Sequence, residues 1–128
     1  MFELEGLDHV ALAVRDVERS ANWYVDVLGF ERRHPGMWEG VPVFVARDKT
    51  AIALFPSGTD RGNPRISRRP GGMLHFAMRA SRKNFVAAQH ELKRRGIAFE
   101  FQDHEISRSI YFRDPDKYVV EITTYELE

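Results

Sequence analysis

Three side chains of this sequence, two imidazoles and one carboxylate, are of the types that bind a divalent metal ion. His9 lies in LDHVALAV at residues 7–14, and His75 has the same place in MLHFAMRA at residues 73–80. Glu121 lies in VVEITTY at residues 119–125, a segment rich in strand-forming residues. Two neutral imidazoles and one carboxylate form a facial ligand set that leaves coordination positions open for a substrate. The trio therefore predicts a metal site that does chemistry.

Alternation along these segments predicts that the three ligands face one hollow. Successive side chains of a strand point to opposite faces. His9 therefore points away from Val10 and Leu12, which we expect to pack on a helix, and His75 and Glu121 alternate with apolar neighbours in the same way. Burial of a lone carboxylate is costly, whereas a cation removes most of that cost, so Glu121 favours a bound metal.

Composition narrows the class of protein. The chain has 128 residues, the size of one domain, and its lack of cysteine excludes disulfides and thiolate metal sites. Lysine plus arginine and aspartate plus glutamate both number 19, so the charge balance does not favour a nucleic-acid partner. Apolar runs are shorter than the roughly 20 residues of a membrane helix, and the first residues lack a signal-peptide pattern. We expect a cytoplasmic protein with a small-molecule substrate and no nucleic-acid or membrane partner.

The chain reads as two copies of one unit. His9 and His75 are 66 residues apart, and the glycines that end the two expected helices, Gly29 and Gly96, are 67 apart. Hydrophobic periodicity predicts helices over 17–28 and 82–95. Alternating segments predict strands over 7–14, 30–34, 41–47 and 50–55 in the first half, and over 73–79, 98–101, 110–112 and 118–125 in the second.

This repeat predicts an α+β fold of two paired βαβββ modules. The modules span residues of about 1–57 and 72–128, and a segment rich in glycine, proline and charge links them over about 58–71. Each module is too small to close its own core, so we expect the two to pair within one domain of residues 1–128. The constant offset places Glu121 opposite Ala53 of the first module.

With these motifs the sequence resembles the vicinal oxygen chelate superfamily, which includes glyoxalase I, fosfomycin-resistance enzymes, bleomycin-binding proteins and extradiol dioxygenases. The resemblance rests on LDHVALAV with a helix ending in VLGFE, on MLHFAMRA, and most specifically on DHEISRSIYFRDPDKYVVEITTY at residues 103–125. It implies a curved, partly open sheet around a metal held by His9, His75 and Glu121. It also implies a homodimer.

The last of these segments resembles the signature of extradiol, catechol-cleaving enzymes. The resemblance implies that His104 acts as an acid and base and that Tyr111 hydrogen-bonds the substrate oxygen. It favours Fe²⁺, while Mn²⁺, Ni²⁺, Co²⁺ and Zn²⁺ also suit such ligands. We expect the substrate, an aromatic diol in this version, to contact Phe55 through its ring and Arg79 through any anionic group.

Other members of the superfamily supply the alternative functions. Glyoxalase I has a second glutamate where this chain has Ala53, and fosfomycin-modifying enzymes usually have a threonine where it has Ala11. A non-catalytic protein that sequesters a flat drug, as bleomycin-binding proteins do, also stays open. Lys117 stands where the extradiol signature usually has glycine, and a lysine at positive φ costs roughly 1 kcal/mol. We therefore expect a different turn geometry at Lys117.

Overall fold

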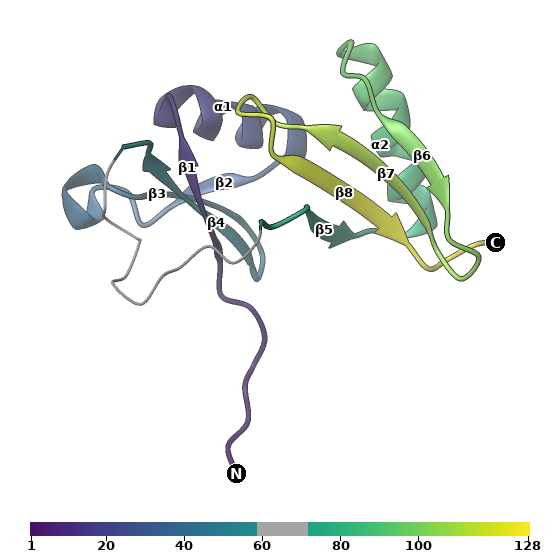
Figure 1. Ribbon diagram of the computed structural model, residues 1–128, viewed down its shortest axis with the longest axis horizontal. Helices are drawn as coiled ribbons and strands as arrows, with labels where there is room; N and C mark the ends of the chain where they lie inside the picture. The colour runs from purple at the N-terminus through teal and green to yellow at the C-terminus, as the bar shows by residue number, and fades with distance from the viewer. Residues whose placement is uncertain (59–71) are drawn as a thin grey trace. The chain divides into compact units, whose positions relative to one another are not determined.

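The computed structural model describes residues 1–58 and 72–128. They divide into two compact units, Met1–Arg68 and Arg69–Glu128, each with one four-stranded mixed sheet and one α-helix (Figure 1). The predicted α+β fold of two βαβββ modules is confirmed, and neither sheet is closed. The predicted linker lies outside the described residues, apart from Gly58. Neither α-helix of the described segments has the length and apolar run needed to cross a bilayer.

Unit 1 contains a helix on one face of its sheet. Its elements are β1 (Val10–Val14), α1 (Val17–Leu28), β2 (Glu31–Arg33), the 3-10 helix η1 (Met37–Gly40), β3 (Val43–Arg47) and β4 (Thr50–Pro56). The strand order is β1-β4-β3-β2, with β1 parallel to β4 and the other pairs antiparallel. The Asp16 side chain accepts a hydrogen bond from the Arg19 amide at 3.0 Å and begins α1. Gly29, at φ 71°, ends it as predicted.

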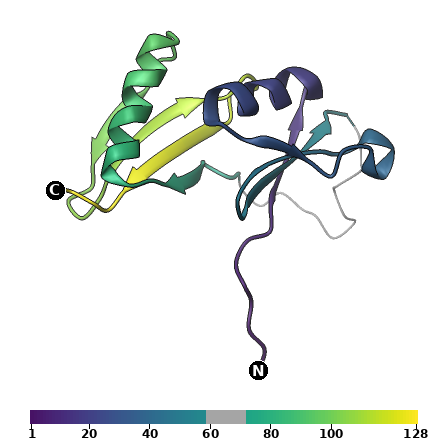
Figure 2. The same cartoon turned by 180° about the vertical axis from the view of Figure 1, so that it is seen from behind.

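Unit 2 repeats this arrangement. Its elements are β5 (Phe76–Arg79), α2 (Arg82–Arg94), β6 (Glu100–Asp103), β7 (Arg108–Arg113) and β8 (Val119–Thr124), in the sheet order β5-β8-β7-β6. Figure 2 shows α2 along one face of this sheet. Phe85 and Leu92 of α2 are buried, as are Ile110, Phe112 and Val120 of the sheet. The face of the sheet opposite α2 is called the open face below.

Strand register confirms that the two units are equivalent residue by residue. Ala11 pairs with Ala53 in unit 1, and Ala77 pairs with Glu121 in unit 2. Glu121 therefore has the position in unit 2 that Ala53 has in unit 1, as predicted from the nearly constant offset of the repeat.

The two histidines lie just outside the strands in which the sequence placed them. β1 begins at Val10 and β5 at Phe76, one residue after His9 and His75 respectively. Both strands are at sheet edges, and their parallel pairing with β4 and β8 begins only at these residues. Each histidine thus lies just before the first paired residue of its strand, and its backbone takes no part in the strand pairing.

The expectation for the turn at Lys117 was wrong, because this residue adopts φ 74°. The Asp114 carboxylate accepts hydrogen bonds from the amides of Asp116 at 2.8 Å and Tyr118 at 3.0 Å. The Arg113 side chain also donates to the Lys117 carbonyl at 2.8 Å. These contacts fix the turn and oppose the steric cost of a left-handed lysine.

Candidate active site

The open face of unit 2 carries a row of polar side chains across three strands. Glu100 pairs with Tyr111, and Tyr111 pairs with Glu121, so the three point to the same face from β6, β7 and β8. The next strand, β5, places Ala77 beside Glu121. His75 lies two residues before Ala77 and brings its ring to this carboxylate.

His75 and Glu121 form the centre of the site. The His75 Nε2 atom is 3.0 Å from Glu121 Oε1. The Ser109 hydroxyl donates to the other carboxylate oxygen, Oε2, at 2.6 Å. Glu121 is only 8% exposed. Its carboxylate is thus nearly buried, with one oxygen held by a hydroxyl and the other aimed at an imidazole.

This arrangement fits a divalent metal ion. Two donor atoms that each bind an ion at about 2.1 Å, at a right angle, lie about 3 Å apart. The measured gap between His75 Nε2 and Glu121 Oε1 matches that spacing. Within either unit, no three His, Asp or Glu side chains gather as a metal site among the described residues. Unit 2 therefore supplies two of the three predicted ligands, and His9 belongs to unit 1.

His9 is oriented as a metal-binding histidine commonly is. Its Nδ1 atom is 2.8 Å from the Asp8 carboxylate, which leaves Nε2 for a ligand. The His9 ring also packs edge-on against Phe44, with ring centroids 5.3 Å apart. Sequence reasoning missed Asp8, although its place directly before His9 was a usable signal.

His104 and Tyr111, the two predicted catalytic residues, are in direct contact. The His104 Nε2 atom lies 3.0 Å from the Tyr111 hydroxyl. The Tyr111 ring also meets the His75 ring edge-on at 5.5 Å. Burial raises the pKa of Tyr111, and the negative charge of Glu121 raises it further. The hydroxyl is therefore neutral at physiological pH and remains a proton donor.

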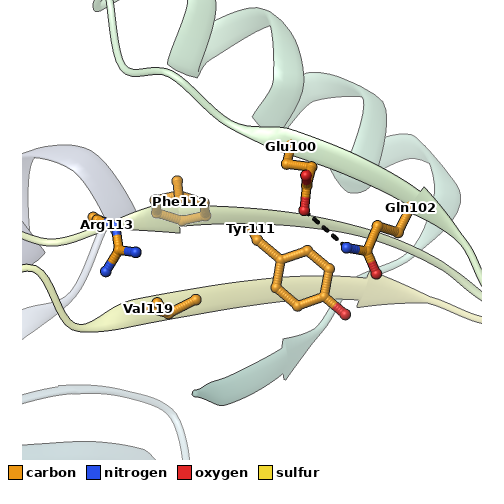
Figure 3. Close-up of a pocket in the computed structure, with 6 residues that line it drawn as sticks. All are labelled: Glu100, Gln102, Tyr111, Phe112, Arg113 and Val119. Carbon is orange, nitrogen blue, oxygen red and sulfur yellow. Dashed lines mark hydrogen bonds between the residues drawn. The ribbon is translucent and has the colours of Figure 1, made fainter. Parts of the chain in front are cut away.

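A pocket of about 300 Å³ lies beside Tyr111 (Figure 3). Its wall includes Tyr111 and also Val119, which lies two residues before Glu121 on the same face of β8. The full lining is Glu100, Gln102, Tyr111, Phe112, Arg113 and Val119. Tyr111 thus joins the pocket to the His75 and Glu121 pair, because its ring contacts His75 and its backbone pairs with Glu121.

Neither Arg79 nor Phe55, the predicted substrate contacts, lines this pocket. The Arg79 guanidinium carbon is 4.6 Å above the centre of the Tyr125 ring, and Phe55 is a half-buried residue of β4 in unit 1. Sequence reasoning missed Ser109 and the pocket residues Glu100 and Gln102. Ser109 was within reach of such reasoning, because it lies two residues before Tyr111 and a strand places both on one face.

Comparisons with known proteins show the family and the fold. The family model described as Glyoxalase/Bleomycin resistance protein/Dioxygenase superfamily matches residues 6–122. The glutathione transferase FosA of Serratia marcescens is 22% identical over 93% of this chain and 80% of its own length. A catechol-2,3-dioxygenase of Bacillus subtilis (strain 168) is 27% identical over 86% of this chain, which spans only 38% of that enzyme. The lactoylglutathione lyase of Agrobacterium tumefaciens shares the fold, with TM-score 0.73, 24% identity and 94% of each chain covered.

Proposed function

Because the chain belongs to the glyoxalase/bleomycin resistance protein/dioxygenase superfamily, we propose that it is a divalent-metal-dependent enzyme acting on a small molecule with two adjacent oxygens. Its sharpest form is extradiol cleavage of a catechol, with dioxygen as co-substrate. The observation that carries the proposal is the ion pair of His75 with the buried Glu121, beside the contact between His104 and Tyr111. Relatives named as a transferase and a dioxygenase support an enzyme in this superfamily.

The ligands we propose are His9, His75 and Glu121. Their nitrogen and oxygen donors suit Fe²⁺, and they also suit Mn²⁺, Ni²⁺, Co²⁺ or Zn²⁺. When bound, such an ion supplies a Lewis acid that polarises the two substrate oxygens. Ser109 holds Glu121 in place, and Asp8 orients His9.

The proton chemistry falls to His104 and Tyr111. Tyr111 keeps its proton and donates a hydrogen bond to one substrate oxygen in the pocket. His104, whose Nε2 lies 3.0 Å from the Tyr111 hydroxyl, takes a proton from the substrate and returns it. Phe55 and Arg79 stay proposed substrate contacts, for an aromatic ring and for an anionic group.

Among the alternatives, the unit register argues against a glyoxalase-type reaction. That reaction would use a second carboxylate at the position of Ala53, and alanine can neither bind a metal nor take a proton. A fosfomycin-modifying enzyme would share the three-ligand site, but this chain has Ala11 where such enzymes usually have a threonine. The proposal therefore favours ring cleavage over these two reactions.

A non-catalytic protein that binds a flat drug is the second candidate. The aromatic cluster of unit 1 favours it, because the rings of Trp38 and Phe44 lie 5.3 Å apart at an angle of 34°. His34 packs edge-on against both rings. A pocket of about 250 Å³ adjoins this cluster, lined in part by His34 and Phe44. Such a protein would bind an aromatic compound and release it unchanged.

The test is elemental analysis of the purified protein, then anaerobic loading with Fe²⁺ and a panel of catechols in air. We expect one equivalent of metal for each proposed site and a coloured ring-opened product. Metal without product from any catechol would overturn the dioxygenase proposal and keep the metal site. Neither bound metal nor product, with tight binding of an aromatic drug, would favour the second candidate. Light scattering tests the proposed homodimer.

A further inference from the structure

Two neighbouring side chains of β6 form a wall of hydrogen-bond acceptors in the unit 2 pocket. The Gln102 Nε2 group donates to Glu100 Oε2 at 2.8 Å. This bond uses an amide N–H and fixes the amide plane. The Gln102 carbonyl oxygen and the second Glu100 oxygen therefore remain available as acceptors. Figure 3 shows the Gln102 oxygen turned away from Glu100, towards the side of the Tyr111 hydroxyl.

Register places this acceptor wall on β6, across Tyr111 from Glu121. Glu100 pairs with Tyr111, and Gln102 pairs with Ser109, the residue that holds Glu121. A molecule bound beside Tyr111 thus has the acceptors of Glu100 and Gln102 on the side that faces β6. The Glu100 carboxylate lies in the wall of the pocket and carries a negative charge. The electrostatic potential here therefore favours a positive group.

The cationic group of the pocket lies at its other end. Arg113 and Ser109 are four residues apart on β7, so Arg113 and Gln102 lie on opposite sides of Tyr111 along the strand. One guanidinium N–H of Arg113 is already used by the Lys117 carbonyl at 2.8 Å. The other N–H groups of Arg113 remain donors, so the pocket has acceptors at one end and donors at the other.

The residue equivalent to Glu100 in unit 1 has the opposite charge. Arg33 pairs with Phe44 as Glu100 pairs with Tyr111, so a cation has the place of the Glu100 carboxylate. The repeated fold therefore does not require an acid at this point of the sheet. We therefore attribute the acid at position 100 to the function of the pocket.

We propose that Glu100 and Gln102 determine substrate specificity. They select a substrate that carries a hydrogen-bond donor, best a protonated amine, on the part of the molecule remote from its two vicinal oxygens, and they disfavour a carboxylate there. A protonated amine gains a charge-assisted hydrogen bond from Glu100 and a second hydrogen bond from the Gln102 carbonyl. A carboxylate at this wall meets the negative charge of Glu100 and is disfavoured. This inference rests on the proposed function, because it takes the vicinal oxygens as the group held near His75 and Glu121.

The test compares three catechols that differ only at the end of a two-carbon substituent. They are 4-(2-aminoethyl)catechol, 4-ethylcatechol and 3,4-dihydroxyphenylacetate. Their dissociation constants are measured by calorimetry without oxygen, on protein loaded with Fe²⁺ and freed of unbound metal. We expect the amine to bind about tenfold more tightly than the carboxylate, with the ethyl compound between them.

Two pocket variants and one control locate the effect. Glu100→Gln should reduce the preference of amine over carboxylate to about twofold, because the charge is lost and the size is kept. Gln102→Leu should weaken binding of the amine about threefold and leave the ethyl compound unchanged. Glu105→Gln removes an equal charge from a turn outside the pocket and should change neither ratio. An unchanged thermal midpoint shows that each variant is folded.

The outcomes separate the inference from its premise. Tight binding of 4-ethylcatechol, with the carboxylate bound as well as the amine, would overturn the specificity role and keep the proposed function. An amine preference that persists in Glu100→Gln would overturn it as well. Binding of none of the three catechols to the metal-loaded protein would overturn the proposed function, and the inference with it.

Discussion

The two units share strand order, helix ends and register, yet their open faces carry different chemistry. A row of Glu100, Tyr111 and Glu121 crosses the sheet of unit 2. The equivalent row of unit 1 is Arg33, Phe44 and Ala53. In this row unit 1 therefore has an apolar ring and a methyl group where unit 2 has a phenol and a carboxylic acid. The duplicated scaffold supplies equivalent positions, and a few side chains make the two faces chemically different.

The helix-facing sides of the two sheets show no such difference. Leu12, Val45 and Leu54 are buried in unit 1, as Ile110 and Val120 are in unit 2. Apolar burial stabilises each unit in the same way. The buried Glu121 gains nothing of this kind and is costly without a cation or hydrogen bonds. Its presence in one copy alone indicates a functional requirement of unit 2.

The largest effect should come from making the two equivalent positions identical. Glu121→Ala gives unit 2 the alanine that unit 1 has at position 53, and should weaken metal binding by more than about 100-fold and remove turnover. Ser109→Ala, which frees one carboxylate oxygen, should weaken metal binding by about tenfold. Calorimetric titration with Fe²⁺ or Zn²⁺ measures both. Full metal affinity in Glu121→Ala would contradict the ligand role.

The next effect concerns protons and should leave the metal in place. His104→Ala should lower kcat by about 100-fold or more at unchanged metal content, because a general acid and base contributes that much. Met37 precedes Phe44 by seven residues, as His104 precedes Tyr111. Met37→Ala is therefore the matched control in unit 1, and kcat should stay within about twofold. Equal turnover in His104→Ala and the wild type would dismiss the role of His104.

A third change transfers the acid to the other unit. Ala53→Glu puts a carboxylate at a position that is 0% exposed, next to Phe44 and Ala11. We expect the free energy of unfolding of the metal-free protein to fall by about 3 kcal/mol in urea titrations. Ala11→Glu, at an exposed position on the neighbouring strand, should cost less than about 1 kcal/mol. Equal costs would show that burial is not the cause.

Sequence patterns predicted the shared scaffold because its signals are local. Alternation gave the strands, periodicity gave the helices, and Gly29 and Gly96 marked the helix ends. The direct contact of His104 with Tyr111 fits the roles that the family resemblance implied. The starts of the edge strands β1 and β5 were placed too early, because the pairing of edge strands depends on where the neighbouring strand begins.

The acceptor wall of unit 2 was beyond the reach of local patterns. Glu100 and Gln102 face Tyr111 and Ser109 only because β6 pairs with β7 in one particular register. A shift of one residue would turn both side chains to the other face of the sheet. Nothing in the composition of β6 indicates that register.

A smaller effect should follow from exchanging the rings at equivalent positions. Tyr111→Phe gives unit 2 the ring of unit 1 and should lower kcat about tenfold, because one hydrogen bond to the substrate oxygen is lost. Phe44→Tyr adds a hydroxyl to the other copy and should leave kcat within about twofold of the wild type. Steady-state assays with the best catechol measure both variants. A kcat that Tyr111→Phe leaves unchanged would show that this hydroxyl faces away from the substrate.

The smallest effect compares the two hairpins that end in β4 and β8. Each has a non-glycine residue at positive φ, Asp48 at 55° and Lys117 at 74°. Lys117→Gly should raise the free energy of unfolding by about 0.5 kcal/mol, because relief of left-handed strain exceeds the added entropy of the unfolded chain. Asp48→Gly should gain less, since aspartate tolerates this conformation better than lysine. Urea titration of both variants without metal measures the difference. A loss of stability in Lys117→Gly would mean that the hydrogen bonds of Asp114 and Arg113 already hold the turn without strain, and that the two hairpins differ in side-chain anchoring more than in backbone geometry.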